Sequence, residues 1–249
     1  YPGEYCLKNN INTVNEIMDK YDLPNEDKTK LWGIIYPIFT HEEFQRRMNA
    51  LEFAHHADIS LGYHILSDAV VTYILAKKKK LPEENLEIAV TIAMFHDLYE
   101  IPWQNSGIIK SRMTNRHGFT HPIEGAINAS VWYPMYFENE KKSEIIIDGI
   151  IHHMYPFPVR ALDETPAELN NEQKFKKLEP TIKNLIISSS MRSKIGHISL
   201  CRSKYQEGRI MSTADKYVSI FKDLKSLEAQ KACITGINKN LDSYKRLRK

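Results

Sequence analysis

Histidine and aspartate residues recur at the ends of apolar helical stretches in this chain. The clearest example is His96-Asp97, which closes the apolar stretch Ala93-Met94-Phe95. An ionised carboxylate that is buried without a partner is costly, so Asp97 needs a strong one. A divalent cation is the strongest partner available, and imidazole with carboxylate is a ligand set that suits Fe, Mn or Zn. The doublet by itself is compatible with a metal site and with an ordinary surface pair at a helix end, so the other candidate ligands decide between the two.

Other side chains that can bind metals follow the same pattern. Each lies in or beside an apolar segment with helical spacing, and together they are His64, His121, His152, His153 and Asp215. Helices can turn their inner faces toward one centre and gather ligands from distant parts of a chain. We therefore expect one or two transition-metal ions, with Fe, Mn or Zn as the preferred metals and Mg or Ni as alternatives.

The order of these residues resembles the HD superfamily of metal-dependent phosphohydrolases. In that family a His on one helix precedes a His-Asp doublet at the end of the next helix, followed by further histidines and a late Asp. The resemblance covers roughly residues 50–225. His121-Pro122 with Gly125, and His152-His153 with Tyr155-Pro156, are similar to the motifs of the branch that contains cyclic-dinucleotide phosphodiesterases. Short soluble bacterial HD phosphohydrolases carry a related His-Met-aromatic-Pro stretch.

The resemblance implies how the ligands are divided and what they do. A first metal would be held by His64, His96, Asp97 and Asp215, and Asp97 would bridge to a second metal held by His121, His153 and His152. In the short soluble enzymes only the second of the two neighbouring histidines is a firm ligand, so His152 is the weaker member. The implied reaction is hydrolysis of a phosphoester or phosphodiester of a nucleotide or cyclic (di)nucleotide by a metal-activated hydroxide, with Asp97 and His96 as catalytic residues.

Phosphate also needs cations. Lys110, Arg112 and Arg116 fall in a loop-like stretch between the His-Asp doublet and His121. A loop between two ligand segments passes near the site, so these residues are predicted to bind the substrate, and Lys110 also to assist catalysis. Lys216 beside Asp215 is a similar candidate. The alternative for all of them is an ordinary solvated basic surface. Asp148, one turn before His152, could orient a ligand ring or face solvent.

Two other functions are compatible with the same ligands. One is a di-iron oxygenase of the HD fold, which bound iron and oxygen consumption would reveal. The other is a metal-containing nucleotide-binding module that does not turn its ligand over. The sequence also departs from the cyclic-dinucleotide branch, because no Gly precedes Tyr155-Pro156 and Ser60 stands where a Glu is expected one turn before His64. These departures leave the substrate open.

Composition narrows the class of partner. The formal net charge of +3 is too small for a protein that wraps nucleic acid, and the basic runs at 77–80 and 245–249 fit solvated helix ends. No apolar run reaches the roughly 18 residues that span a membrane. Three separate cysteines without a Cys-x-x-Cys pair favour a reducing, cytoplasmic location. We expect a small nucleotide as partner and no membrane. Nucleic-acid binding is a weaker alternative that rests on the basic C-terminal helix, and the sequence leaves a homo-oligomer open.

Helical periodicity dominates the chain and predicts an all-α, single-domain helical bundle. The expected helices are 9–21, 25–36, 40–55, 61–79, 83–97, one opened by Pro122, 142–153, 173–188, 211–227 and 229–246. No strand-like alternation is visible over a full window. The predicted organisation is an N-terminal helical extension at 1–50, an HD domain at 51–228 with an insertion at about 158–205 that could be a lid, and a basic C-terminal helix at 229–249.

Overall fold

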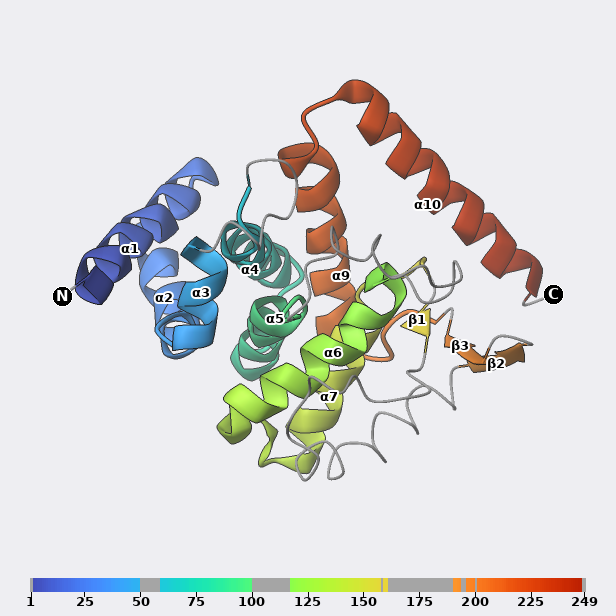
Figure 1. Ribbon diagram of the computed structural model, residues 1–249, viewed down its shortest axis with the longest axis horizontal. Coiled ribbons are helices and arrows are strands. Elements are labelled where there is room, and N and C mark those ends of the chain that lie inside the picture. The colour runs from blue at the N-terminus through green and yellow to red at the C-terminus, as the bar shows by residue number, and fades with distance from the viewer. Residues whose placement is uncertain are drawn as a thin grey trace.

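A computed structural model describes residues 2–49, 59–99, 117–157, 159–160, 190–193, 196–199 and 201–247. Within these residues the architecture is helical, which confirms the predicted all-α fold (Figure 1). The helical elements in chain order are α1 (Pro2–Lys20), α2 (Asn25–Phe39), α3 (Glu42–Asn49), α4 (Leu61–Lys78), α5 (Glu83–Phe95), α6 (His117–Trp132), η4 (Pro134–Phe137), α7 (Glu140–Ile151), α9 (Gln206–Val218), the π-helical turn η5 (Ser219–Asp223) and α10 (Leu227–Leu247).

A small antiparallel sheet accompanies the helices. Its strands are β1 (Val159–Arg160), β2 (Ser190–Ser193) and β3 (Gly196–Ser199), in the order β1-β3-β2. Val159 pairs with Ser199, and Ser190 pairs with the same residue from the other side. Strands this short offer no alternating pattern to read, which is why the sequence did not predict them. The helix predicted at 173–188 lies outside the described residues.

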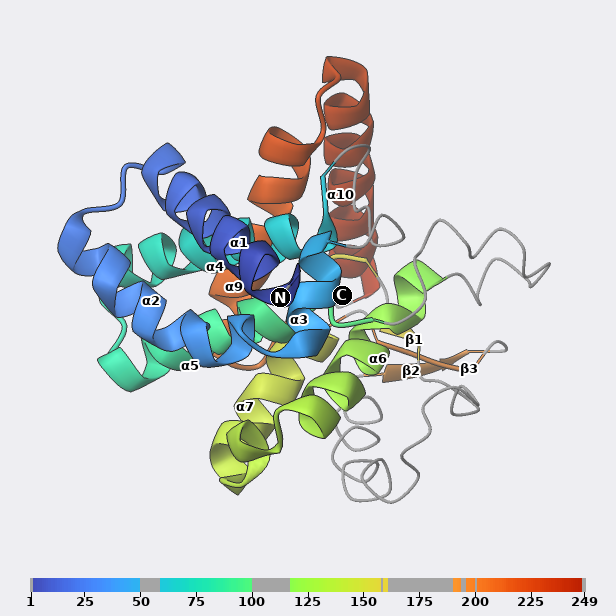
Figure 2. The same cartoon turned by 60° about the vertical axis from the view of Figure 1, so that its left-hand side comes forward.

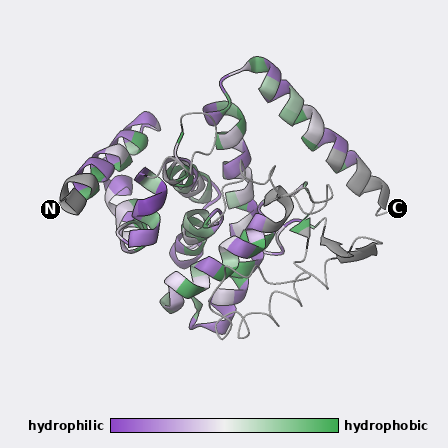
Figure 3. Cartoon of the chain, in the orientation of Figure 1, coloured by the Kyte–Doolittle hydropathy of each residue, from purple (hydrophilic) through white to green (hydrophobic). Residues whose placement is uncertain are grey.

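The pair α4 and α5 forms the middle of the bundle, and α9 packs against both (Figure 1). From Ile88 to Phe95 every residue of α5 is buried, as expected for a helical segment without a polar face. Figure 3 shows this contrast with α3, whose residues are mostly hydrophilic. Buried residues of α1 and α2, such as Ile17 and Leu31, belong to the same core cluster as those of α4 and α5.

Helix α6 begins earlier than predicted. Pro122 was expected to open this helix, but it lies inside, because the helix starts at His117. A proline inside a helix removes the bond to the carbonyl four residues back, here that of Gly118. That carbonyl lies in the first turn of α6, so the missing bond affects only the start of the helix.

The last helix, α10, extends away from the bundle, as two views of the molecule show (Figures 1 and 2). Its apolar residues Leu227 and Ile234 are exposed. Among the described residues, no helix combines the length and apolar character needed to cross a membrane.

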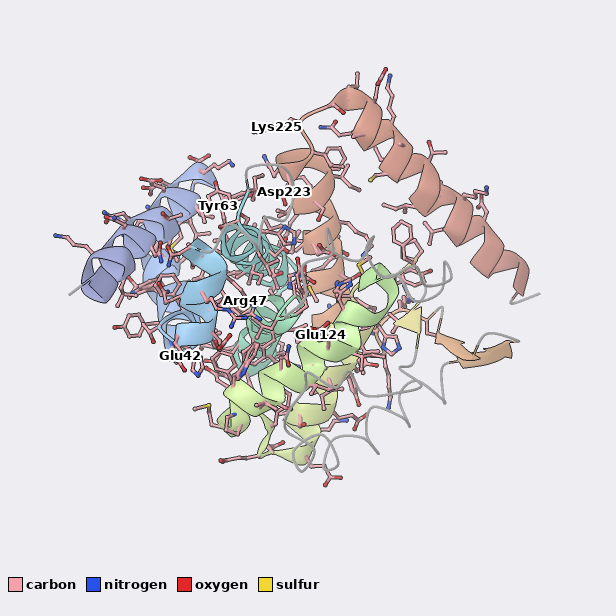
Figure 4. All side chains as sticks on the ribbon, in the orientation of Figure 1. Glu42, Arg47, Tyr63, Glu124, Asp223 and Lys225 are labelled. Atoms are coloured by element: carbon pink, nitrogen blue, oxygen red, sulfur yellow. The ribbon has the colours of Figure 1, made fainter. Side chains whose placement is uncertain are left out.

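Arg47 on α3 ties the N-terminal helices to the bundle (Figure 4). Its guanidinium is fully buried and donates to the carbonyl oxygen of Tyr99 at 2.7 Å and to the Glu43 carboxylate at 3.1 Å. It also lies 4.6 Å from the ring centroid of Trp132. If such a buried guanidinium is removed, the acceptors of its hydrogen bonds stay buried without a donor, which lowers the stability of the fold.

Replacing Arg47 with methionine should lower the free energy of unfolding by about 3 kcal/mol, because a buried carbonyl and a carboxylate lose their donor. Urea unfolding followed by circular dichroism measures this loss. The matched control is Arg46→Met on the same helix, whose side chain is 40% exposed and pairs with Glu43 at 3.5 Å. An exposed pair contributes about 0–1 kcal/mol. Equal losses in the two variants would show that Arg47 does not anchor α3.

Candidate metal centre

Four buried side chains from three helical segments form what we refer to as the first group: His64, Asp68, His96 and Asp215. His64 and Asp68 lie one turn apart on α4, so both face the same side of that helix. His96 follows the last residue of α5, and Asp215 lies on α9. One ligand atom from each residue falls within 4.8 Å of the others.

Asp68 lies between the two histidines of the first group. Its Oδ2 atom is 3.0 Å from Nε2 of His64 and 3.4 Å from Nε2 of His96. Oδ1 of Asp215 approaches Nε2 of His64 at 3.6 Å. The donor atoms thus converge from different directions, as the ligands of a metal ion do.

Asp97 connects this group to a second one. Its Oδ2 atom lies 3.6 Å from Nε2 of His96 and 3.9 Å from Nε2 of His64. Its Oδ1 atom lies 3.2 Å from Nε2 of His121 and 3.6 Å from Nε2 of His153. The second group is therefore Asp97, His121 and His153, and the Nε2 atoms of its two histidines are 3.1 Å apart. The two carboxylate oxygens of Asp97 face different groups.

The rings of His96 and His153 are hydrogen-bonded through the nitrogen that faces away from the centre. Nδ1 of His96 lies 2.7 Å from the carbonyl oxygen of Ala93, and Nδ1 of His153 lies 2.7 Å from that of Ile150. A carbonyl can only accept, so each Nδ1 carries the proton. Nε2 of each ring therefore faces the centre, which is the usual orientation of histidine in metal sites.

Buried polar atoms without hydrogen-bond partners also indicate that the first group can hold a cation. Oδ1 of Asp68 and Nε2 of His96 are buried and have no hydrogen-bond partner among the described residues. Buried polar atoms are nearly always satisfied, and an ion is one of the explanations for an exception. The buried His/Asp groups can thus hold a metal ion, as expected from the sequence. The donor atoms are imidazole nitrogen and carboxylate oxygen, a set that suits Fe, Mn or Zn.

The ionisation of most of these groups suits metal ligands. Burial raises the pKa of Asp97, but the rings of His96, His121 and His153 outweigh burial and hold it well below its ordinary value. Burial, with the nearby charges of His96 and His121, lowers the pKa of His153 to about 3. Burial raises the pKa of Asp68 to about 6 despite the opposing charge of His64. At neutral pH Asp97 and most of Asp68 are therefore ionised and His153 is neutral. Burial lowers the pKa of His64, but Asp68 and Asp223 outweigh burial and hold it well above its ordinary value, so a metal ion would displace a proton from this ring.

Two buried carboxylates near the centre were not among the predicted site residues. Asp68 belongs to the first group, and its position four residues after His64 was the signal that could have found it. Asp223 lies with its Oδ2 atom 2.7 Å from Nδ1 of His64. Its distance along the chain left no pattern in the sequence to connect the two residues.

His152 was predicted as a second-metal ligand, and it is not a member of either group. Its Nδ1 atom lies 3.1 Å from Oδ1 of Asp148. Asp148 is buried, so the solvent-facing alternative left by the sequence is wrong; its carboxylate contacts the ring of His152, and the orientation of a metal ligand by Asp148 stays a prediction. Asp148 also accepts from the Ser203 hydroxyl at 2.5 Å and from the backbone N–H of Lys204 at 2.9 Å.

Of the four basic residues predicted to bind the substrate, the structure describes one. Lys110, Arg112 and Arg116 lie outside the described residues. The ammonium of Lys216 donates to the carbonyl oxygen of His153 at 2.7 Å, and to the carbonyl and hydroxyl oxygens of Ser212 at 3.0 and 2.8 Å. An ammonium has three donors, so these contacts use all of them. Burial lowers the pKa of Lys216 to about 8. This arrangement favours a structural role, and substrate binding by Lys216 stays a prediction.

A glycine sets the distance between α6 and the His-Asp doublet. A Cβ atom on Gly125 would lie 2.7 Å from the carbonyl oxygen of His96 and 3.4 Å from that of Phe95. Both are backbone atoms, so a larger residue must push the helices apart. His121 lies one turn earlier on α6, and its distance to Asp97 depends on this close approach.

We expect Gly125→Ala to lower the free energy of unfolding by about 1–3 kcal/mol, as overpacking in a close contact does. We also expect less metal bound at the second group, because His121 moves away from Asp97. Thermal unfolding and elemental analysis measure the two effects. The control is Gly236→Ala on α10, where nothing lies within 4 Å of an added Cβ. An unchanged midpoint and metal content in Gly125→Ala would contradict the argument.

Comparisons with known proteins add no family to these observations. No protein-family model, no curated protein and no solved structure matches the chain.

Proposed function

We propose that this chain is a metal-dependent phosphohydrolase of the HD type, which cleaves a phosphoester or phosphodiester of a nucleotide or cyclic (di)nucleotide. The proposal is carried by Asp97, whose Oδ2 faces the first group and whose Oδ1 faces the second. A carboxylate in this position suits a pair of metal ions. The order of ligands along the chain, which resembles that of the HD superfamily, supplies the reaction type.

The residues of the two groups would divide two metal ions between them. His64, Asp68, His96 and Asp215 would hold one metal ion, and Asp97, His121 and His153 would hold the other. When bound, the two ions supply Lewis-acid stabilisation of charge on a phosphoryl group and a lowered pKa for water. The backbone carbonyls of Ala93 and Ile150 keep the rings of His96 and His153 in the tautomer that binding requires.

The test is a hydrolysis assay with the full chain. The protein is loaded with Mn²⁺ or Fe²⁺, its metal content is verified, and it is offered nucleotides and cyclic dinucleotides, with products identified by mass. We expect release of a phosphate or an opened nucleotide, lost with a chelator and restored by metal. Oxygen uptake without hydrolysis by the iron-loaded chain would point instead to an oxygenase. Tight nucleotide binding without any turnover would point to a non-catalytic module.

A further inference from the structure

The ring of His64 has a carboxylate behind it. Its Nδ1 atom lies 2.7 Å from Oδ2 of Asp223, and both side chains are buried. Asp223 is the last residue of η5, and Figure 4 shows it at the end of α9, beside the N-terminal part of α4 that carries Tyr63. We propose that Asp223 is a positioning residue that holds His64 with its Nε2 atom turned toward the first group. This inference rests on the metal centre of the proposed function.

The π-helical turn explains why Asp223 reaches His64. In an α-helix a residue seven positions further on faces nearly the same side, because each residue turns by about 100°. Counted from Asp215, that residue is Lys222. The backbone N–H of Leu224, however, bonds to the carbonyl of Ser219 five residues back, at 3.1 Å. The turn therefore contains one residue more, and Asp223 faces the centre instead.

The side chain of Lys222 lies beside two tyrosine rings and not beside His64. Its ammonium lies 5.6 Å from the ring centroid of Tyr21 and 5.5 Å from that of Tyr217. A straight α-helix would direct this cation toward His64, where it would repel a metal ion. The π turn therefore exchanges a cation for an anion at the position facing His64. Turns of this kind are often found at functional sites.

The contact has a chemical consequence for the ring. An ionised carboxylate can accept hydrogen bonds but cannot donate them, so Nδ1 of His64 donates to Asp223. Nε2 is then directed at Oδ2 of Asp68, 3.0 Å away. A carboxylate behind a ligating histidine fixes the ring and increases its basicity. Behind the other histidine of the first group, His96, the described residues place the carbonyl oxygen of Ala93, which is uncharged. Asp223 thus adds a negative charge as well as an acceptor.

The competing explanation is that this contact only ties η5 to α4. A stability measurement does not separate the two explanations, because both predict a loss on substitution. A measurement that observes the ring and the bound ion does separate them. An asparagine at 223 keeps an acceptor oxygen and removes the charge, an alanine removes both, and a glutamate keeps both on a longer side chain.

The experiment uses the full chain with Asp223→Asn, Asp223→Ala and Asp223→Glu. The matched control is Glu228→Gln, an exposed carboxylate in the first turn of α10. Co²⁺ affinity is measured by competition with a chelating dye, and proton NMR of the Co²⁺-loaded protein records the shifted, exchangeable ring N–H signals of ligating histidines. Circular dichroism verifies that each variant is folded.

We expect Co²⁺ affinity to fall about 10–100-fold in Asp223→Ala, less in Asp223→Asn, and to recover in part in Asp223→Glu. One exchangeable ring signal should broaden or vanish in Asp223→Ala and persist in the control. Wild-type affinity and an unchanged ring spectrum in a folded Asp223→Ala would overturn the inference. A wild type that binds Co²⁺ but hydrolyses nothing would defeat the proposed function and leave this inference standing. A wild type that binds no metal would defeat both.

Discussion

Asp97→Asn should remove most of the metal and nearly all of the hydrolytic activity. Asp97 is the one residue whose carboxylate oxygens face both groups of the described centre, so its charge is lost from both at once. Lewis-acid stabilisation contributes several kcal/mol to such reactions, so kcat/KM should fall by about 10³-fold or more. Elemental analysis of the purified variant, beside steady-state kinetics on the best substrate of the wild type, measures both losses.

A matched control isolates the effect of position. Asp22→Asn makes the same chemical change in an exposed turn, where the backbone φ of 53° is one that asparagine also adopts. This variant should keep wild-type metal content and activity. If Asp97→Asn also kept its full metal content, the carboxylate would not be shared between two ions and the binuclear arrangement would be wrong.

Asp68→Asn should halve the metal-dependent stabilisation of the chain. A ligand at a concentration of about 100 times its Kd stabilises by about 2.7 kcal/mol, which corresponds to about 5–10 °C in the Tm of a chain of this size. Asp68 lies within 3.4 Å of both histidines of the first group, so its loss should affect one ion and leave the other. The shift is the difference in Tm between metal-loaded and chelator-treated protein.

Taking this difference removes the effect of the substitution on the metal-free protein, since that effect is present in both measurements. Asp22→Asn again serves as the control and should show the full shift. Asp68→Asn should also bind about one ion fewer per chain by elemental analysis. A full metal-dependent shift in Asp68→Asn would exclude Asp68 from the ligands and return the first group to the ligand set read from the sequence.

Much of the helical architecture could be predicted because helical periodicity is a local property of the sequence. The apolar spacing of α4 and α5 predicted both helices nearly to their ends. The start of α6 was missed because a proline was taken as its first residue, whereas Pro122 lies inside it. The three short strands were missed because none is long enough to show alternation.

The candidate ligands could be predicted to different degrees for physical reasons. His64, His96 and Asp97 stand out because polar residues interrupt apolar helices there, and the structure brings them together. Asp68 lay on the same helical face as His64 but carried no motif of its own. Asp223 could not be predicted, because α-helical periodicity places Lys222 on the side that faces His64. The π turn departs from that periodicity and brings Asp223 to His64 instead.

The order in which the ligands appear along the chain affects how the protein is made. Asp215 lies on α9 and completes the first group, while His64 and His96 lie far upstream of it on α4 and at the end of α5. A ribosome that has not yet reached α9 has already synthesised every other predicted ligand. Before α9 leaves the ribosomal tunnel, the nascent chain therefore lacks one of the four side chains of the first group, and we expect complete metal loading to follow that step.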